Sequence, residues 1–426
     1  MKAYRAIIIN PVDKDRAEAY RDGFLVVNPD GIIEYCGESS DCPIKTVNLE
    51  IQDYSDHIIL PGLIDTHVHL PQYSAIGRGK GELLDWLEKY IFPLETKFDE
   101  DEFAREQSKL FFEDALSYGT TTMSVYCSVH PCATDIAFET ADKLGVRAFI
   151  GNSLMDENVP KELVEKSSLA ESKKIIDKWH GTDNSRLSYI LTPRYAGCCS
   201  MELMRKCSEI SKSEKLLIQT HIAENREELE FISKLYPNHK NYAEIYLDAG
   251  ILNENTLLAH GVYLSEQEQK IIKDSGATIC HCPNSNRFLQ SGFMPLRKYF
   301  NNGMKISLGS DIAGGSSLSI LNEAKEAIET TKARNIISYP DREEVLSAEE
   351  ALWLSTLAGA EVLKIDSLSG NLLEGKEADF IILDGNEIKD KSILNEDLIS
   401  SLIYKYSEKR VMQTFVRGRE VFATCR

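Results

Sequence analysis

Eight short apolar or β-branched runs recur through the middle of the chain, and helical segments separate most of them. The runs cover 58–64, 120–126, 146–151, 187–191, 216–220, 256–259, 277–280 and 305–308. Such alternation predicts parallel strands joined by crossover helices. Eight strands of this kind fit an α/β fold, the closed (β/α)8 TIM-like barrel, whose catalytic groups follow the carboxyl ends of the strands. An open doubly wound sheet is the alternative, but the sequence has no Gly-rich phosphate turn after its first strand.

The clearest helical signal covers residues 100–118, between the first two barrel strands. Asp99 stands in the N-cap position and Gly119 provides the stop signal. Because apolar side chains recur there at helical spacing, one face of the helix should point toward the barrel. The predicted apolar face comprises Phe103, Leu110, Phe111 and Ala115.

Both ends of the chain are instead rich in short strand signals. Pro presets φ and Gly tolerates a positive φ, so Asn28-Pro29-Asp30-Gly31 predicts a turn between two strands. Neither end is long enough to close a core alone, and we expect the two ends to build one small β-sandwich domain. Strands are predicted at 6–9, 24–27, 32–35, 378–383 and 411–416, and the domain boundaries are 1–60 and 365–426 for the small domain and 61–364 for the barrel.

The charge of the chain argues against several classes of partner. Lys and Arg total 48 against 67 Asp and Glu, a net charge of −19, which repels nucleic acid and anionic membrane surfaces. No apolar run approaches the ~20 residues of a membrane span. The apolar stretch at 6–9 is too short for a signal-peptide core, so we expect a cytoplasmic protein.

Histidines and one aspartate at the predicted strand ends indicate a metal site. His67 and His69 follow the first strand, and alternate residues of an extended chain point to the same side. His221, His260 and Asp311 end strands five, six and eight. Three His and one carboxylate suit a borderline metal such as Zn²⁺ and leave a position for water.

Another His, in Cys280-His281-Cys282, ends the seventh strand. We interpret this tripeptide as small buried thiols at the end of an apolar run rather than as a metal cluster. The 10 Cys are otherwise scattered without a CxxC pair, which is ordinary for a reducing compartment. Whether His281 reaches the metal site is left open by the sequence.

The strings around these residues resemble the amidohydrolase superfamily, in its chlorohydrolase and aminohydrolase branch. They are PGLIDTHVHL, QTHIAEN, LLAHG, HCPNSN and SLGSDIAGG, and GNLLEGKEADFIILD resembles the return into the small β domain. Within that branch the likeness is greatest to the guanine deaminase family. This second likeness rests on THVHLPQYSAIG, TPRYAGCCSMELM, SNRFLQSGFMPL and GSDIAGGSSLS.

The resemblance implies a single zinc held by His67, His69, His221 and Asp311. Members with two metals bridge them through a Lys at the end of strand four, and residues 189–194 contain no Lys. The implied catalytic residues are Glu224, His260 and Asp311. Glu224 is expected one helical turn beyond His221, whereas Glu227 and Glu228 are expected on a solvent-facing helix surface. Asp311 would accept a proton from the attacking water, Glu224 would pass a proton to a ring nitrogen, and His260 would hydrogen-bond the developing oxygen. Iron in place of zinc is left open.

The same resemblance implies hydrolysis of guanine to xanthine and ammonia in purine catabolism or salvage, by a homodimer. Gln72 can donate and accept at the guanine edge, and Arg194 offers donors for the carbonyl and N7. Tyr73 and Tyr195 would form walls of the pocket. The structural alternatives are that Arg194 forms an ion pair at the barrel rim and that both tyrosines belong to the core.

Three other functions are weighed against this one. A related enzyme could deaminate or dechlorinate cytosine, adenosine-type compounds or triazines, although those relatives would line positions 72 and 194 differently. A non-catalytic scaffold would have lost part of the ligand set, which is complete here. A metal-storage or regulatory protein would have no use for Glu224.

Overall fold

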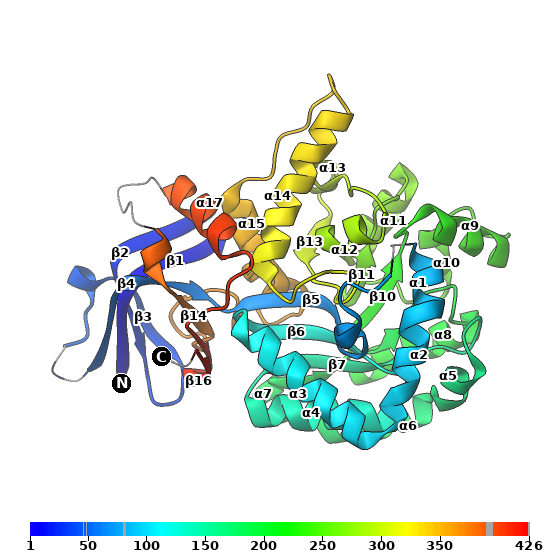
Figure 1. Ribbon diagram of the computed structural model, residues 1–426, viewed down its shortest axis with the longest axis horizontal. Coiled ribbons are helices and arrows are strands. Elements are labelled where there is room, and N and C mark those ends of the chain that lie inside the picture. The colour runs from blue at the N-terminus through cyan, green and yellow to red at the C-terminus, as the bar shows by residue number, and fades with distance from the viewer. Residues whose placement is uncertain (46, 48, 80–81, 389–394, 425–426) are drawn as a thin grey trace.

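The computed structural model describes residues 1–45, 47, 49–79, 82–388 and 395–424, and its larger part is a parallel β barrel surrounded by helices (Figure 1). Every strand pair of the barrel is parallel. The strands are β5 (Leu63–His69), β6 (Thr120–Cys127), β7 (Arg147–Leu154), β8 (Leu187–Tyr189), β9 (Thr192–Pro193), β10 (Ile218–Ile222), β11 (Thr256–His260), β12 (Thr278–His281) and β13 (Lys305–Leu308).

Two seams close the barrel. The ladder β5-β6-β7-β8 meets the ladder β10-β11-β12-β13 through a parallel bridge between Leu191 and Ile218. On the other side, the hydroxyls of Thr66 and Ser307 lie 2.7 Å apart, and Asp311 N donates to His67 O at 2.9 Å. The predicted closed (β/α)8 barrel is therefore confirmed.

Crossover helices cover the outside of the barrel, and their apolar faces form the main core with the strands. The long helices are α3 (Asp101–Ser117), α4 (Pro131–Leu144), α6 (Leu169–Trp179), α8 (Met201–Glu214), α9 (Arg226–Leu235), α11 (Glu266–Ser275), α14 (Ile320–Ile337) and α17 (Asn395–Tyr406). The short ones are α1 (Leu83–Trp86), α2 (Phe92–Glu95), α5 (Lys161–Lys166), α7 (Thr182–Ser185), α10 (Tyr242–Asp248), α12 (Pro283–Phe288), α13 (Leu296–Asn301), α15 (Ala348–Leu354) and α16 (Leu357–Val362).

Helix α3 matches the helix predicted at 100–118, with two corrections. Its N-cap is Glu100, while Asp99 lies in a preceding 3₁₀ turn and binds Lys166 at 2.8 Å. Leu110 is 45% exposed rather than part of the buried face. Phe112 is buried instead, because the side of α3 that packs on the barrel is rotated toward Phe111 and Phe112.

Strands from both chain ends form one seven-stranded sheet beside the barrel, as predicted (Figure 1). Tyr4, Phe380 and Phe415 pack together in its core, the last two with ring centroids 4.3 Å apart. The order is β16 (Arg419–Ala423), β15 (Gln413–Val416), β14 (Phe380–Leu383), β4 (Glu50–Pro61), β1 (Lys2–Asp13), β2 (Arg16–Val27) and β3 (Ile33–Glu38).

The run at 58–64, predicted as one barrel strand, is divided at Gly62. Its first part ends β4 of the small sheet, and its second part begins β5 of the barrel. Gly62 N donates to Asp379 O at 2.9 Å, and a Cβ at this position would lie 2.2 Å from Thr121 Oγ1. The chain therefore passes from one sheet to the other where a side chain would not fit.

A buried ion cluster joins the barrel to the small sheet. Arg147 at the start of β7 is fully buried and binds the carboxylates of Glu377 and Asp379, just before β14. Removing one partner of such a buried pair is costly, since the other charge is left without compensation.

Within the described residues, no helix is long and apolar enough to cross a membrane.

Candidate active site

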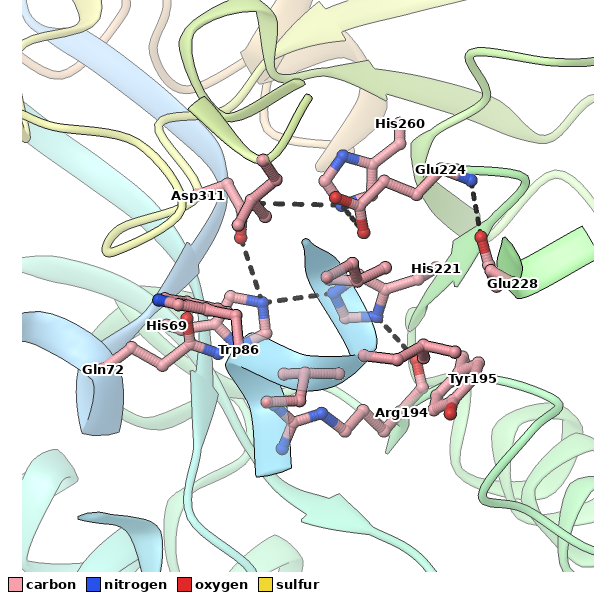
Figure 2. Close-up of a pocket in the computed structure, with 14 residues that line it drawn as sticks. His69, Gln72, Trp86, Arg194, Tyr195, His221, Glu224, Glu228, His260 and Asp311 are labelled. Atoms are coloured by element: carbon pink, nitrogen blue, oxygen red, sulfur yellow. Dashed lines mark hydrogen bonds and ion pairs between the residues drawn. The ribbon is translucent and has the colours of Figure 1, made fainter. Parts of the chain in front are cut away.

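A pocket with several convergent polar side chains opens at the carboxyl ends of the barrel strands (Figure 2). Its polar lining comes from the carboxyl ends of β5, β10 and β11 and from the segments that follow β5, β9, β10 and β13. These lining residues include His69, Gln72, Arg194, His221, Glu224, Glu228, His260 and Asp311.

Four side chains, of which His221 is only partly buried, converge on one point at the base of this pocket. His69 Nε2 lies 3.3 Å from His67 Nε2 and 3.1 Å from His221 Nε2. Asp311 Oδ1 lies 3.2 Å from the Nε2 atoms of both His67 and His69. Zinc with ligands at about 2.0–2.1 Å in a tetrahedron requires its ligand atoms to be about 3.3 Å apart. The spacing therefore fits a metal ion of this size.

His260 also lies close enough to be considered as a ligand. One atom each of His67, His221, His260 and Asp311 falls within a mutual distance of 4.8 Å. However, His260 Nε2 is 3.8 Å from Asp311 Oδ2, whereas His69 makes the 3.2 Å contact to that carboxylate. We therefore place His69 in the ligand set and His260 next to it, facing the same centre.

Burial keeps the converging imidazoles neutral. It lowers the pKa of His67, lowers that of His69 to about 3, and lowers that of His221 well below its ordinary value. Burial alone would raise the pKa of Asp311, but hydrogen bonds from His67 and His69 hold it well below the usual range. Neutral imidazoles and an ionised carboxylate form the donor set that a divalent cation needs.

Groups behind the ligands hold them in place. His221 Nδ1 donates to Arg194 O at 2.6 Å, which directs the Nε2 lone pair toward the centre. Asp65 Oδ1 accepts from His67 N and from Ser310 N, both at 3.1 Å, and so ties β5 to the segment after β13. Asp65 lies in the string around His67, but the sequence did not predict this role for it.

Glu224 and His260 lie next to each other on one side of the pocket (Figure 2). Glu224 Oε2 lies 3.5 Å from His260 Nε2, and burial, reinforced by the charge of Asp311, raises the pKa of Glu224 to about 8. Glu224 does not lie one helical turn beyond His221, as the sequence had suggested. The chain instead bends at Ala223, whose φ is +49°, and α9 begins only at Arg226.

Three residues at the strand ends adopt the left-handed conformation that favours glycine. They are Ala223, His260 and Asp311, with φ of +49°, +72° and +46°. Non-glycine residues in this region carry backbone strain of order 1–3 kcal/mol and persist where the surroundings hold them. This backbone strain lowers the stability of the fold, and the strained conformations direct the side chains of Glu224, His260 and Asp311 toward one point.

Glu228 corrects an expectation from the sequence, which placed Glu227 and Glu228 on a solvent-facing helix surface. Only Glu227 is exposed, whereas Glu228 is 1% exposed and lines the pocket. Its carboxylate accepts from Glu224 N at 2.7 Å and completes the capping box of α9 with Asn225. Burial and the neighbouring Glu224 raise the pKa of Glu228 to about 7. The Asn-x-x-Glu spacing was the available sequence signal.

The structure brings Gln72 and Arg194 to the pocket, but Arg194 has a protein partner. Its Nη1 donates to both carboxylate oxygens of Glu95, at 2.7 and 2.9 Å, and both side chains are almost fully buried. The barrel-rim ion pair that the sequence left as an alternative is therefore present. Gln72 Oε1 accepts from Ala313 N at 3.4 Å.

Of the two tyrosines, only Tyr195 lines the pocket. Tyr73 donates to Asp114 Oδ2 at 2.9 Å and packs against Phe111, so its ring belongs to the α3 interface. Both Gln72 and Tyr73 lie in a 3₁₀ turn, 70–75, in which successive side chains point about 120° apart. Consequently Gln72 faces the pocket and Tyr73 does not.

His281 is fully buried and lies outside the converging group. Among the described residues, neither of its ring nitrogens has a hydrogen-bond partner, and burial lowers its pKa to about 3. Cys280 contacts Ser307 Oγ at 3.6 Å and Cys282 is buried. These observations agree with the interpretation of residues 280–282 as core.

A helical cap covers the pocket, and no pattern in the sequence predicted it. It comprises α1, the π-helical turn Leu87–Ile91 and α2, and it contributes Leu83, Leu84, Trp86 and Leu87 to the lining. Trp86 Nε1 donates to Arg78 O at 2.9 Å. Since α2 also supplies Glu95, the cap is attached to the pocket through Arg194.

Comparison with known proteins agrees with this geometry. The sequence model of the Amidohydrolase family matches residues 58–421. Guanine deaminase of Escherichia coli is 34% identical over 411 residues, 94% of this chain and 91% of the relative. Guanine deaminase of Rattus norvegicus is 35% identical over 427 residues, 95% and 93% of the two chains. The crystal structure of guanine deaminase from C. acetobutylicum, with guanine bound in its active site, is 31% identical with a TM-score of 0.93, covering 99% of this chain and 100% of that one.

Proposed function

The chain belongs to the amidohydrolase family, and from that premise we propose that it hydrolyses guanine to xanthine and ammonia. One observation carries the assignment: a pocket that combines four ligand atoms at tetrahedral spacing with the side chains of Gln72 and Arg194. In the reaction, water adds to C2 of the base and the 2-amino group leaves as ammonia.

We propose that His67, His69, His221 and Asp311 hold one zinc ion per chain. When bound there, zinc would make water acidic enough to act as a nucleophile near neutral pH. Asp311 Oδ2 is not engaged by His67 or His69, which both contact Oδ1, and it accepts from Ser285 Oγ. This oxygen would take the second proton of the added water and pass it to the 2-amino group, which then leaves as ammonia. Buried neutral imidazoles support this ligand set.

Glu224 is the proposed proton carrier. Its carboxyl group is buried in the pocket and lies outside the ligand set, as a general acid and base must. It would take a proton from the attacking water and deliver it to a ring nitrogen of guanine. His260 would hydrogen-bond the oxygen added at C2, with Nε2 accepting from its remaining O–H because Nδ1 carries the ring proton and donates to Asn286.

Gln72 and Arg194 are the proposed recognition residues. Glu95 engages Nη1 of Arg194, and the remaining N–H groups of the guanidinium are available for O6 and N7 of guanine. An amide such as Gln72 can donate and accept at the N1–H edge. Adenine lacks the carbonyl, so a buried donor would lose its partner at a cost of ~1–3 kcal/mol. Tyr195 and the cap would wall the base.

We also propose that the enzyme is a cytoplasmic homodimer that serves purine catabolism or salvage. The dimer, the pathway and the location all rest on the likeness to guanine deaminases. Sedimentation velocity of the purified protein would test the dimer, since a monomer of 48.0 kDa is readily distinguished from twice that mass.

The decisive experiment is a substrate panel with the zinc-loaded protein. Ammonia release and ultraviolet absorbance would be followed with guanine, adenine, cytosine, guanosine and S-adenosylhomocysteine. Guanine should have the highest kcat/KM, and guanosine should be poor because its ribose must fit a pocket closed by the cap. If another compound exceeds guanine, the substrate assignment fails while the metal-dependent hydrolase remains.

A further inference from the structure

We propose that the segment 285–291 is a positioning device that holds all three proton-handling side chains of the site at once. Ser285 Oγ donates to Asp311 Oδ2 at 2.6 Å. Asn286 Oδ1 accepts from His260 Nδ1 at 2.9 Å. Ser291 Oγ donates to Glu224 Oε1 at 3.1 Å. The inference rests on the proposed deamination, and these three are positioning residues because they act through other side chains.

The segment is buried and held from behind. Ser285, Asn286 and Ser291 are each at most 1% exposed. The segment contains the last residues of α12, which begins at Pro283, and Asn284 N of the same helix donates to Glu323 Oε2 of α14 at 3.2 Å. Arg287 forms an ion pair with Glu326, also of α14. The contacts with α14, rather than solvent-exposed loops, therefore fix the position of the segment 285–291 relative to the pocket.

Each contact has a distinct physical consequence. The acceptor at Asn286 keeps the proton of His260 on Nδ1 and directs Nε2 toward Glu224 and Asp311. The hydroxyl of Ser285 donates to Asp311 Oδ2, whereas His67 contacts Oδ1, so the two carboxylate oxygens of Asp311 have different partners. The hydroxyl of Ser291 fixes the rotamer of Glu224 in a pocket where a free carboxyl could turn away.

The sharpest test concerns Asn286 because conservative variants separate its hydrogen bond from its volume. Asn286→Leu removes the acceptor, whereas Asn286→Asp keeps an oxygen at the same place. The matched control is Asn284→Ala, which deletes another buried amide of α12, just before the segment, that donates to Ser316 Oγ at 2.9 Å. All variants would be compared as zinc-loaded protein for kcat, KM, metal content and calorimetric affinity for xanthine.

We expect Asn286→Leu to lower kcat about 10- to 100-fold, the range for groups that orient a catalytic side chain, with unchanged metal content and KM within about threefold. Asn286→Asp should recover most of the loss, and Asn284→Ala should resemble the parent. Normal kcat in Asn286→Leu, loss of metal with kcat, or failure of Asn286→Asp to rescue would each overturn the proposal. Ser285→Ala and Ser291→Ala should likewise lower kcat without loss of metal.

A second measurement does not depend on turnover. In protein labelled with ¹⁵N-histidine, the His260 Nδ1–H group should give a hydrogen-bonded proton resonance in the parent, Asn286→Asp and Asn284→Ala. That resonance should be lost in Asn286→Leu, and its persistence there would contradict the inference. If the parent deaminates no compound of the panel, the proposed function fails, but the resonance still decides whether Asn286 orients His260.

Discussion

The main-chain carbonyl of Arg194 accepts two hydrogen bonds from His221, one from Nδ1 at 2.6 Å and one from the backbone N at 3.1 Å. A proposed metal ligand and a proposed recognition residue are thus joined through a single oxygen atom. Because His221 Nε2 is aimed by this contact, the position of the ion and the position of the guanidinium are coupled. Substitutions on this segment should therefore affect metal binding and substrate binding together.

The first prediction concerns the proposed zinc ligands. His67→Ala or Asp311→Ala should remove zinc and activity together, because a three-ligand remnant of a buried tetrahedral site binds zinc much more weakly. Elemental analysis of the purified variants, beside the parent with about one zinc per chain, measures this. His281→Leu is the control, since this buried His lies outside the converging group. Stoichiometric zinc in a His67→Ala/His221→Ala variant would refute the assignment.

Glu224→Gln tests the proton carrier. The amide preserves size but cannot carry a proton between water and the ring, so kcat should fall by ~10² or more. Zinc content and xanthine affinity should stay near those of the parent, because Glu224 lies outside the ligand set. Glu227→Gln, at an exposed neighbouring position, should leave kcat unchanged. Near-normal turnover of Glu224→Gln would show that another group carries the proton.

The pair Glu95–Arg194 separates a structural role from recognition. Arg194→Met leaves the Glu95 carboxylate buried without its partner, which should lower the free energy of unfolding by about 3–5 kcal/mol. It should also raise KM for guanine at least as much as it lowers kcat, since Arg194 is proposed to contact the edge of the base away from C2.

The double variant Glu95→Leu/Arg194→Met distinguishes the two effects. It removes both charges, so urea denaturation should show most of the lost stability restored. KM should remain high, because the donors for the base are still missing. If KM recovers together with stability, Arg194 is only an ion-pair partner and does not recognise the substrate.

The burial of His281 should make the free energy of unfolding depend on pH. Its pKa is about 3 in the folded protein, through burial, against an ordinary value of 6.5. Between these values the unfolded chain binds a proton that the folded chain does not, so the free energy of unfolding falls as pH falls, by about 1.4 kcal/mol per pH unit. Above pH 6.5 both states are neutral and this contribution vanishes.

His281→Leu should abolish that contribution. In urea denaturation of metal-free protein, the variant should gain about 2 kcal/mol on the parent between pH 7.5 and pH 5. At pH 7.5 it should be at least as stable as the parent, because an imidazole without partners in the described residues is replaced by an apolar side chain. An equal difference at both pH values would show that His281 is protonated normally in the folded state.

Several site residues were predictable because local geometry alone controls them. His67 and His69 are two positions apart in a strand, so period-two alternation places both imidazoles on one side whatever the rest of the chain does. His260 and Asp311 end strands of a parallel barrel, whose carboxyl ends meet at one rim. All eight runs predicted as barrel strands overlap strands of the structure for the same reason.

Other residues were misjudged where packing partners decide the outcome. Glu228 has the spacing of an ordinary surface helix residue, and it is buried only because the backbone N–H groups of Glu224 and Asn225 need an acceptor inside the pocket. Tyr73 adjoins Gln72 in the chain yet faces α3, because the 3₁₀ turn rotates it there. Leu110 is exposed because the barrel contacts a neighbouring face of α3.

The sequence by itself determined the fold class and the strands that carry the candidate site, because these depend on period and spacing, whereas the proposed ligand set follows from the resemblance of the surrounding strings to known amidohydrolases. Only the tertiary structure decided which of the remaining polar groups face one another. Glu95 and Arg194 are 99 positions apart, and Glu224 and Ser291 are 67 apart. Whether such groups meet depends on the angles at which the cap and α12 pack on the barrel. Those angles follow from side-chain packing across the whole core, which no local pattern contains.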